Sequence, residues 1–462
     1  LEPAGIGARN LQECLLLQMH QRRADTASKR LAKKILQSHF DEFVKKHYEK
    51  LISRLGVSED EFRDAIDEIK RLSPKPGNLY SDGGMDTSPY IIPDFRIDYH
   101  DGQFDDARMA CNLAQTCVEQ GGVVANRTEV VTVLHDEKGK VCGVVAKDLL
   151  SGKEYTVKAK AVINAAGCFV DEVLQMDKPG EAKMVVPSQG VHIVLDMKFL
   201  QSDYAIMVPK TSDGRVLFAV PWHDKVVVGT TDIQRPTAES EPRPLDEEID
   251  FILETASHYM TPAPTRADIV SVFAGQRPLA APKKEGKKSK EVSRSHKVVV
   301  SDNDLITITG GKWTSYRKMA EDTVDKAIKL GKVEKRKCVT RKLKVHGWRP
   351  NPNLADHMYV YGADEPAILN MIKENPALGE KLSEKYDYTV AEVLWAIRHE
   401  MALTVDDVLA RRVRLLFVDA REAQKAAPRV AQILAEELSR DQAWIDEQVA
   451  SFTELASHYY VA

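Results

Sequence analysis

The sequence has no run of about 18 consecutive apolar residues, so it offers no candidate for a membrane-spanning helix. Its six cysteines form no CxxC pair and no histidine cluster accompanies them. This argues against a structural zinc site and a disulfide framework, and favours a reducing compartment such as the cytoplasm. The first residues lack the pattern of a secretory signal peptide. The chain does not begin with methionine and opens inside an amphipathic pattern, so we expect a fragment of a longer chain.

What remains is ordinary for a soluble globular protein: a formal net charge of −4 and 43% hydrophobic residues. The first 98 residues predict helices. Apolar residues recur at helical spacing from Leu31 to Ile52, where we expect one helix that ends at Gly56. Ser58 and Glu61 form a capping box that begins a second helix, and the prolines of PKPG at 74–77 end it.

These two helices fit either a DNA-binding helix-turn-helix or a helical hairpin packed in a core. Phosphate contact requires positive charge, and the second helix is acidic, which argues against direct DNA binding. Its acidic residues are Glu59, Asp60, Glu61, Asp64, Asp67 and Glu68.

Three strings in this region resemble the core-binding region of the sigma-54 class of bacterial transcription factors. They are LEPAGIGARNLQECLLLQ at 1–18, LSPKPG at 72–77 and SPYIIPDF at 88–95. The resemblance implies contact with core RNA polymerase. The family's activator-responsive region, its promoter-reading helix-turn-helix and its basic terminal motif are not found, so the resemblance extends to a polymerase contact and not to transcription initiation.

After residue 98 the pattern changes to short β-branched runs separated by glycine turns. Residues 121–167 predict a β-meander that ends in AVINAAG, and 214–222 and 225–232 predict neighbouring antiparallel strands. The Ala-Ala-Gly turn either admits a flat or phosphorylated ligand or is simply a tight turn. LITITGGK at 305–312 predicts a strand, a double glycine and an amphipathic helix. The glycines either form an anion or carbonyl-oxygen site or cap the helix beside a solvated lysine.

Several motifs of residues 99–330 occur in order: YHDGQFDDAR, VINAAG, PSQGVHIVLD, VVGTTD, FAGQRPL and TITGGKWTSYRKM. Together they resemble the FAD-dependent glycerol-3-phosphate dehydrogenase family. VLWAIRHEMALTVDDVLARR at 393–412 is similar to that family's helical tail domain. The resemblance implies an α+β/α/β multidomain fold. We expect a helical fragment over 1–98, a partial FAD domain with an antiparallel substrate-domain sheet over 99–340, and a helical domain over 341–462.

The resemblance also implies chemistry: oxidation of sn-glycerol 3-phosphate to dihydroxyacetone phosphate, with hydride passing to FAD and electrons to membrane quinone. Arg277 matches the phosphate-binding arginine, His192 the candidate base, and Lys312 the positive group near the reduced flavin. These three residues are the expected catalytic and substrate-binding set. The expected cofactor-binding residues are Val130, Ala165, Ala166, Gly167, Gly310, Gly311 and Lys312.

Two departures from the family pattern matter. Cys168 follows the Ala-Ala-Gly turn where the family usually has proline. The larger departure is the missing GxGxxG loop for the FAD pyrophosphate. The nearest string, AGIGARN, has Asn10 at the third glycine position and follows no strand. We therefore expect weak FAD binding, impaired activity and unpaired strand edges. The chain resembles a splice near DYHDGQFD, and a natural fusion, an engineered one and an assembly error all remain open.

The basic loop at 281–297 fits either contact with anionic lipid or a solvated surface, since Glu285 and Glu291 interrupt it. The expected location is accordingly the cytoplasm, with peripheral attachment to the inner face of the cytoplasmic membrane as the alternative.

Overall fold

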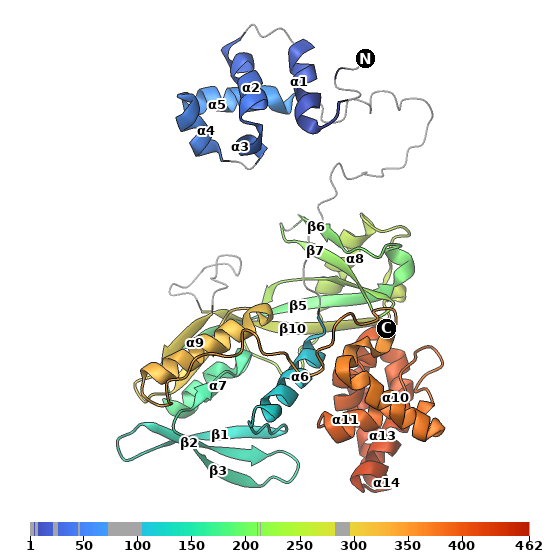
Figure 1. Cartoon of the computed structure of the whole chain (residues 1–462). Coiled ribbons are helices and arrows are strands. Elements are labelled where there is room, and N and C mark those ends of the chain that lie inside the picture. Colours follow the sequence, from blue (N-terminus) through green and yellow to red (C-terminus); the bar gives the residue numbers. More distant parts are fainter. Residues whose placement is uncertain are drawn as a thin grey trace. The chain divides into compact units, whose positions relative to one another are not determined.

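The computed structural model describes residues 4, 8–21, 26–44, 47–72, 104–209, 211–212, 214–281 and 296–461 (Figure 1). The chain divides into two compact units, Leu1–Asp101 and Gly102–Ala462. The PKPG and SPYIIPDF strings, most of the LEPAGIG string and most of the basic loop lie outside the described residues. The predicted domain divisions at 98 and 340 stay predictions.

The first unit is a helical bundle formed by α1 (Leu11–Gln21), α2 (Ala27–Ser38), α3 (Phe40–Val44), α4 (Tyr48–Leu55) and α5 (Glu59–Lys70). The prediction of one helix up to Gly56 was wrong, because the backbone leaves helical geometry at His39, where φ is −135°. Gly56 does end α4, at a φ of 64°, and Ser58 and Glu61 form the predicted capping box. The bundle has its own apolar core, which includes Met19, Ile35, Leu36, Leu51, Phe62 and Ile69.

The second unit contains three sheets. The predicted meander is confirmed as an antiparallel sheet of β1 (Thr128–His135), β2 (Val141–Asp148) and β3 (Glu154–Lys158). The helix α7 (Val170–Asp177) packs against it through Leu174, which shares a core with Val133.

The run AVINAAG does not end the meander as predicted. Its strand, β4 (Ile163–Asn164), leaves that sheet and pairs in parallel with β12 (Ile306–Thr309), which also pairs antiparallel with β11 (Lys297–Val300). Within the described residues β4 is therefore the edge strand of a three-stranded sheet. The helix α9 (Tyr316–Lys329) follows β12 after the double glycine.

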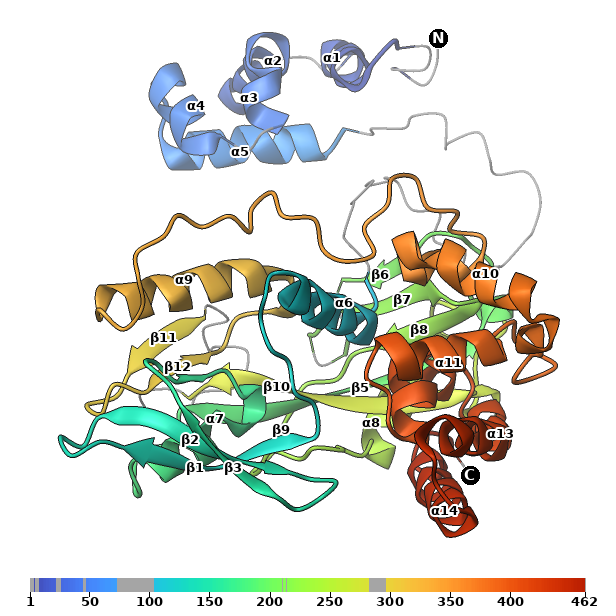
Figure 2. The ribbon, with the colours of Figure 1, turned by 60° about the horizontal axis from the view of Figure 1, so that its bottom comes forward.

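The largest sheet has the order β10-β5-β8-β7-β6, and β9 pairs additionally with β5 (Figure 2). Its strands are β5 (Val185–Asp196), β6 (Ile206–Val208), β7 (Leu217–Trp222), β8 (Lys225–Gly229), β9 (Ile233–Gln234) and β10 (Ser271–Ala280). All of the pairings are antiparallel, as predicted for 214–222 and 225–232. The helix α8 (Asp246–Ser257) packs on one face through Ile249 and Ile252.

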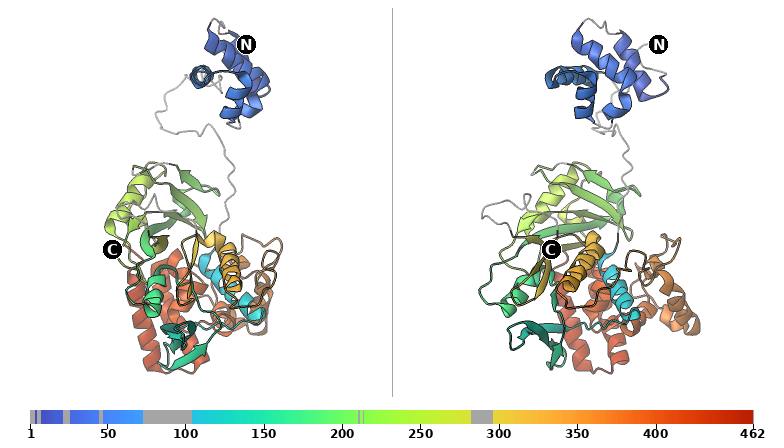
Figure 3. Two further views of the ribbon diagram at one scale, coloured as in Figure 1. Left: turned by 90° about the vertical axis from the view of Figure 1, so that its left-hand side faces the viewer. Right: turned by 60° about the vertical axis from the view of Figure 1, so that its left-hand side comes forward.

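The C-terminal helices gather into one bundle, drawn in orange and red in Figure 3. They are α10 (Glu365–Glu374), α11 (Val390–His399), α12 (Leu415–Val418), α13 (Ala420–Leu438) and α14 (Gln442–Ser457). The helix α6 (Asp106–Glu119) is joined to them by a buried ion pair between Arg108 and Glu400. Across the described ranges, no helix combines the length and apolarity needed to cross a bilayer.

Candidate active site

Two predicted site residues lie on neighbouring strands of the large sheet. Arg277 on β10 is opposite Ser188 on β5, and His192 on β5 is opposite Phe273 on β10. Between these two pairs, Gly275 faces Gly190. Side chains at every second position share one face of a sheet, so Arg277 and His192 point to the same side, with the glycine pair between them.

The guanidinium of Arg277 extends over the gap that Gly190 leaves. A β carbon on Gly190 would lie 2.6 Å from Nη1 and from Nη2 of Arg277. Nη1 donates a hydrogen bond to the carbonyl of Thr231 at 3.3 Å, and Nη2 donates to Oγ1 of Thr230 at 3.2 Å. The side chain is therefore fixed at one end, in the orientation that a bidentate contact with an oxyanion requires.

The imidazole of His192 lies between an aromatic ring and a glycine. It stacks on Phe273 with 5.2 Å between ring centroids, and a β carbon on Gly229 would come within 2.4 Å of its Cδ2. Burial, with the positive charge of Arg277 as a second cause, lowers the pKa of His192 to about 4, while Asp106 at the start of α6 opposes the shift. The ring is consequently neutral near pH 7 and has a free nitrogen lone pair, although the same shift makes it a weaker base than an exposed histidine.

The predicted cofactor turns lie at one edge of the small parallel sheet. Because β4 and β12 are parallel neighbours, the Ala165-Ala166-Gly167 turn and the Gly310-Gly311 turn both follow the carboxyl ends of their strands. Ala165 and Ala166 are exposed. Gly310 and Gly311 have φ values of 72° and 78°, which a side chain rarely adopts. Backbone amides and small residues at this edge fit a flat ring with carbonyl groups.

Lys312 follows these glycines and is exposed. Its carbonyl accepts a hydrogen bond from Oγ of Ser315 at 2.9 Å, which holds the turn between β12 and α9. Val130 lies half-buried in β1, within the meander sheet. The expected cofactor residues thus come from two sheets. Cys168 lies half-buried, and its thiol donates to the carbonyl of Gln276, next to Arg277.

Sequence reasoning missed the residues that hold the site in place. The GTTD segment at 229–232 was predicted only as the end of a strand and as part of a family motif, yet Thr230 and Thr231 bind Arg277, and Asp232 accepts a hydrogen bond from Ser188. The glycines at 190, 229 and 275 were likewise not singled out. The only available signal was their occurrence inside otherwise β-branched strands, where glycine often marks a close approach.

The β4 edge shows what the flavin site lacks. Within the described residues β4 pairs with β12 alone, and Ile163 on it is 42% exposed. A doubly wound dinucleotide fold places the strand that carries its glycine-rich loop in the same parallel sheet. The residues present therefore fit the ring end of a flavin, whereas no complete GxGxxG string for the pyrophosphate occurs in the 462 residues.

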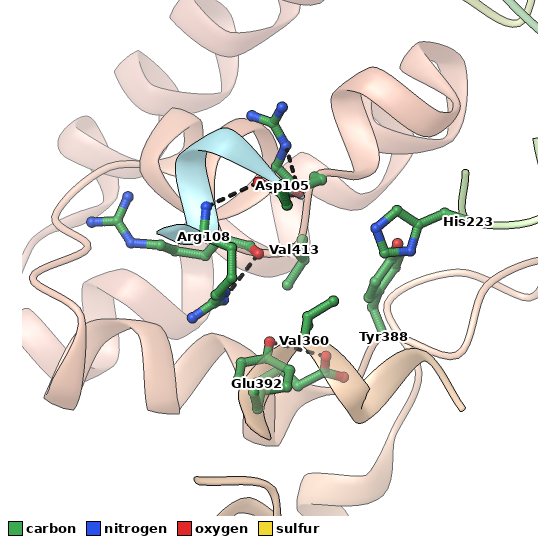
Figure 4. A pocket seen from close by; sticks show the side chains of 10 residues that line it. Asp105, Arg108, His223, Val360, Tyr388, Glu392 and Val413 are labelled. Carbon is green, nitrogen blue, oxygen red and sulfur yellow. Dashed lines mark hydrogen bonds and ion pairs between the residues drawn. The ribbon is translucent and has the colours of Figure 1, made fainter. Parts of the chain in front are cut away.

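A separate cavity lies between α6 and the C-terminal helices (Figure 4). It is lined by charged and aromatic side chains, among them Arg108, His223, Tyr388 and Glu392. A neighbouring groove of about 970 Å³ is lined by Trp222, Tyr359, Tyr386 and Tyr388. His192, Arg277 and Lys312 line neither space. The part of the chain that the structure describes contains no group of three side chains suited to hold a metal ion.

Comparison with known proteins gives two family matches. Residues 18–317 match the model of the FAD dependent oxidoreductases, and residues 304–445 match the C-terminal domain of alpha-glycerophosphate oxidase. The first match begins within the helical unit and extends through Arg277 and Lys312.

Similarities to individual proteins are consistent with these two family matches. The chain is 36% identical over 368 residues to a probable mitochondrial glycerol-3-phosphate dehydrogenase of Dictyostelium discoideum, covering 73% of this chain and 57% of that protein. It is 38% identical over 370 residues to the mitochondrial glycerol-3-phosphate dehydrogenase of Mesocricetus auratus, covering 74% of this chain and 50% of that protein. A solved structure, the glycerol-3-phosphate dehydrogenase of Bacillus halodurans complexed with FAD, matches with a TM-score of 0.66 and 30% identity, covering 77% of this chain and 73% of that one. The chain thus spans about half the length of these two curated relatives.

Proposed function

Because the chain belongs to the family of FAD dependent oxidoreductases, we propose that its second unit is the substrate-binding half of a glycerol-3-phosphate dehydrogenase. In this proposal it acts on sn-glycerol 3-phosphate to give dihydroxyacetone phosphate. The observation that carries the proposal is the pairing of a fixed guanidinium with a neutral imidazole on one face of β5 and β10. A phosphate needs the first group, and a hydroxyl that must lose a proton needs the second.

Each residue has one role in this proposal. Arg277 binds the phosphate through the two terminal nitrogens that Thr230 and Thr231 orient. His192 accepts the proton of the C2 hydroxyl; its imidazole is unprotonated near pH 7, which this role requires, and its lowered pKa makes it a weak base in the chain without substrate. Lys312 supplies positive charge beside the Gly310-Gly311 turn.

FAD is the cofactor of this proposal and, when bound, supplies the acceptor for the C2 hydride. Ala165, Ala166, Gly167, Gly310 and Gly311 would face its ring, and Val130 would lie on its adenine side. The exposed edge of β4 and the absence of a GxGxxG string favour weak retention of the cofactor and impaired activity. Transfer of the electrons to quinone at a membrane surface belongs to the same proposal.

Substrate binding can be tested without the cofactor. Calorimetric titration of the purified chain with sn-glycerol 3-phosphate should show binding that Arg277→Lys weakens roughly tenfold, because lysine keeps the charge and loses the fork. Arg266→Lys is the matched control, since Arg266 is paired with Asp246 and Asp250 away from this face. No binding by the wild-type chain, or equal binding by Arg277→Lys, would remove the proposal.

Cofactor retention needs a separate measurement. The visible absorbance spectrum of the purified protein should lack the band of oxidised flavin, and added FAD should restore little oxidation of glycerol 3-phosphate. A yellow protein with a normal rate of oxidation would contradict impaired activity and leave the substrate assignment in place.

A second candidate function concerns residues 1–98, for which we propose contact with core RNA polymerase. The observation that favours it is that this unit has its own apolar core and can therefore act as a separate module. Co-precipitation of core polymerase with the full chain should disappear in Leu36→Asp, which opens that core, and persist in Arg277→Lys. Failure of the wild-type chain to retain polymerase would eliminate this function.

A further inference from the structure

A buried carboxylate that the proposed chemistry does not use lies behind Arg277. Glu248 is in the first turn of α8, with 1% of its surface exposed. Its Oε1 accepts a hydrogen bond from Oγ1 of Thr231 at 2.6 Å. Its Oε2 accepts from Nε2 of Gln189 at 2.7 Å and from the backbone N–H of Leu245 at 3.1 Å.

Thr231 connects this carboxylate to both predicted substrate residues. Its hydroxyl oxygen accepts from the backbone N–H of Val191, the residue before His192, at 2.9 Å. Its carbonyl oxygen accepts from Nη1 of Arg277 at 3.3 Å. A single threonine therefore fixes strand β5 beside the imidazole and fixes one nitrogen of the guanidinium.

Stability of α8 does not account for this arrangement. Capping the helix requires one acceptor for the N–H of Leu245, and Oε2 provides it. Oε1 is directed at Thr231. A buried carboxylate is costly unless its oxygens are hydrogen-bonded, and an apolar side chain would fill the same space at lower cost. The hydrogen bond between Oε1 and Thr231 is thus explained by the orientation that it imposes on Thr231.

We propose that Glu248 is a positioning residue for the phosphate-binding Arg277 and acts through the hydroxyl of Thr231. This rests on the proposed function, in which Arg277 binds the phosphate of sn-glycerol 3-phosphate. The contacts of its hydroxyl anchor Thr231 to Glu248 and to the backbone of β5. Without them the backbone at Thr231 is held less firmly, the carbonyl that accepts from Nη1 can shift, and the guanidinium loses the orientation that a bidentate contact needs.

The test compares Glu248→Gln and Thr231→Val with the wild-type chain by calorimetric titration with sn-glycerol 3-phosphate. The amide introduced by Glu248→Gln has one oxygen and cannot accept at both former positions, so its NH2 group faces a donor. Valine keeps the shape of threonine without the hydroxyl. Both variants should bind roughly tenfold more weakly. Glu254→Gln, on the exposed part of the same helix, is the matched control and should bind like wild type.

The losses of affinity caused by Glu248→Gln and by Thr231→Val should not add, because both changes break the same hydrogen bond between the two side chains. The double variant should bind like either single variant, and Glu248→Gln should cost nothing further in an Arg277→Lys background. A purely structural role of Glu248 would lower the melting temperature and leave the affinity of the folded protein unchanged. That result, with wild-type binding intact, would overturn this inference alone. Absence of binding by the wild-type chain would overturn the proposed function and this inference with it.

Discussion

The guanidinium of Arg277 covers the α carbon of Gly190 so closely that no β carbon fits between them; one would lie 2.6 Å from each terminal nitrogen. The strand partner of Gly190 is Gly275, around which a β carbon would meet nothing within 4 Å. Of the two glycines paired across β5 and β10, only Gly190 is required by a close contact, and it determines where the guanidinium lies.

Gly190→Ala should displace Arg277 and leave the fold intact. The atoms that a new methyl group would meet are the end of the Arg277 side chain and Oγ1 of Thr230, which can rotate away. We expect affinity for sn-glycerol 3-phosphate to fall roughly tenfold, measured by calorimetry, with little change in melting temperature. Wild-type affinity in Gly190→Ala would show that the position of Arg277 does not depend on this gap.

His192 should make the protein less stable in mild acid. Its pKa is about 4 in the folded chain, whereas an unfolded histidine binds its proton near pH 6.5, as an approximate reference value. The unfolded state therefore binds more protons between these values, and the contribution of His192 to stability is lost as pH falls through this range. Urea titrations of wild type and His192→Phe should show this extra slope only in wild type. An imidazole that titrates near its reference value by NMR would contradict the prediction.

His346 should have the opposite pH dependence. Burial disfavours its charge, but hydrogen bonds with Glu119, at 2.5 Å, and Asp364, at 2.8 Å, outweigh burial and raise its pKa. Its contribution to stability is fully present below the unfolded pKa and is lost as pH rises through the folded one. His346→Asn should accordingly destabilise the chain most in mild acid, measured by urea unfolding at a series of pH values. His258→Asn, at the exposed end of α8, is the control.

The thiol at position 168 should be unreactive. Burial raises the pKa of Cys168 to about 11, so little thiolate forms near neutral pH. Alkylation with iodoacetamide followed by mass spectrometry should modify the exposed Cys117 well before Cys168. Faster labelling of Cys168 would show that the turn after Ala-Ala-Gly is open to solvent.

Local patterns predicted local structure well. Ser58 and Glu61 cap α5 as predicted, because a capping box needs only residues three apart. The alternation of β-branched residues gave the meander and the antiparallel pair. Periodicity failed where two short helices have compatible faces, as on either side of His39, since a break of one residue hardly changes the apolar pattern.

Long-range pairing could not be predicted in the same way. The run at 161–167 was assigned to the meander because it follows it in sequence, but Ile163 pairs with Ile306, which lies in a distant part of the sequence. The candidate site has the same limit: motifs predicted Arg277 and His192 as site residues, but only the register of β5 and β10 shows that they lie on one face. Thr231 and Glu248 act through contacts between elements, which no local spacing reveals.

The ion pair between Arg108 and Glu400 joins positions 292 residues apart, and the same arginine donates to the carbonyl of Arg412. During synthesis on the ribosome, α6 emerges long before the helices that satisfy its charge. A buried arginine without its partner is strongly destabilising. We therefore expect α6 to stay solvated in the nascent chain until Glu400 and Arg412 have been made. Termination of synthesis before these residues would leave Arg108 permanently without its partner and α6 without the helices that bury it.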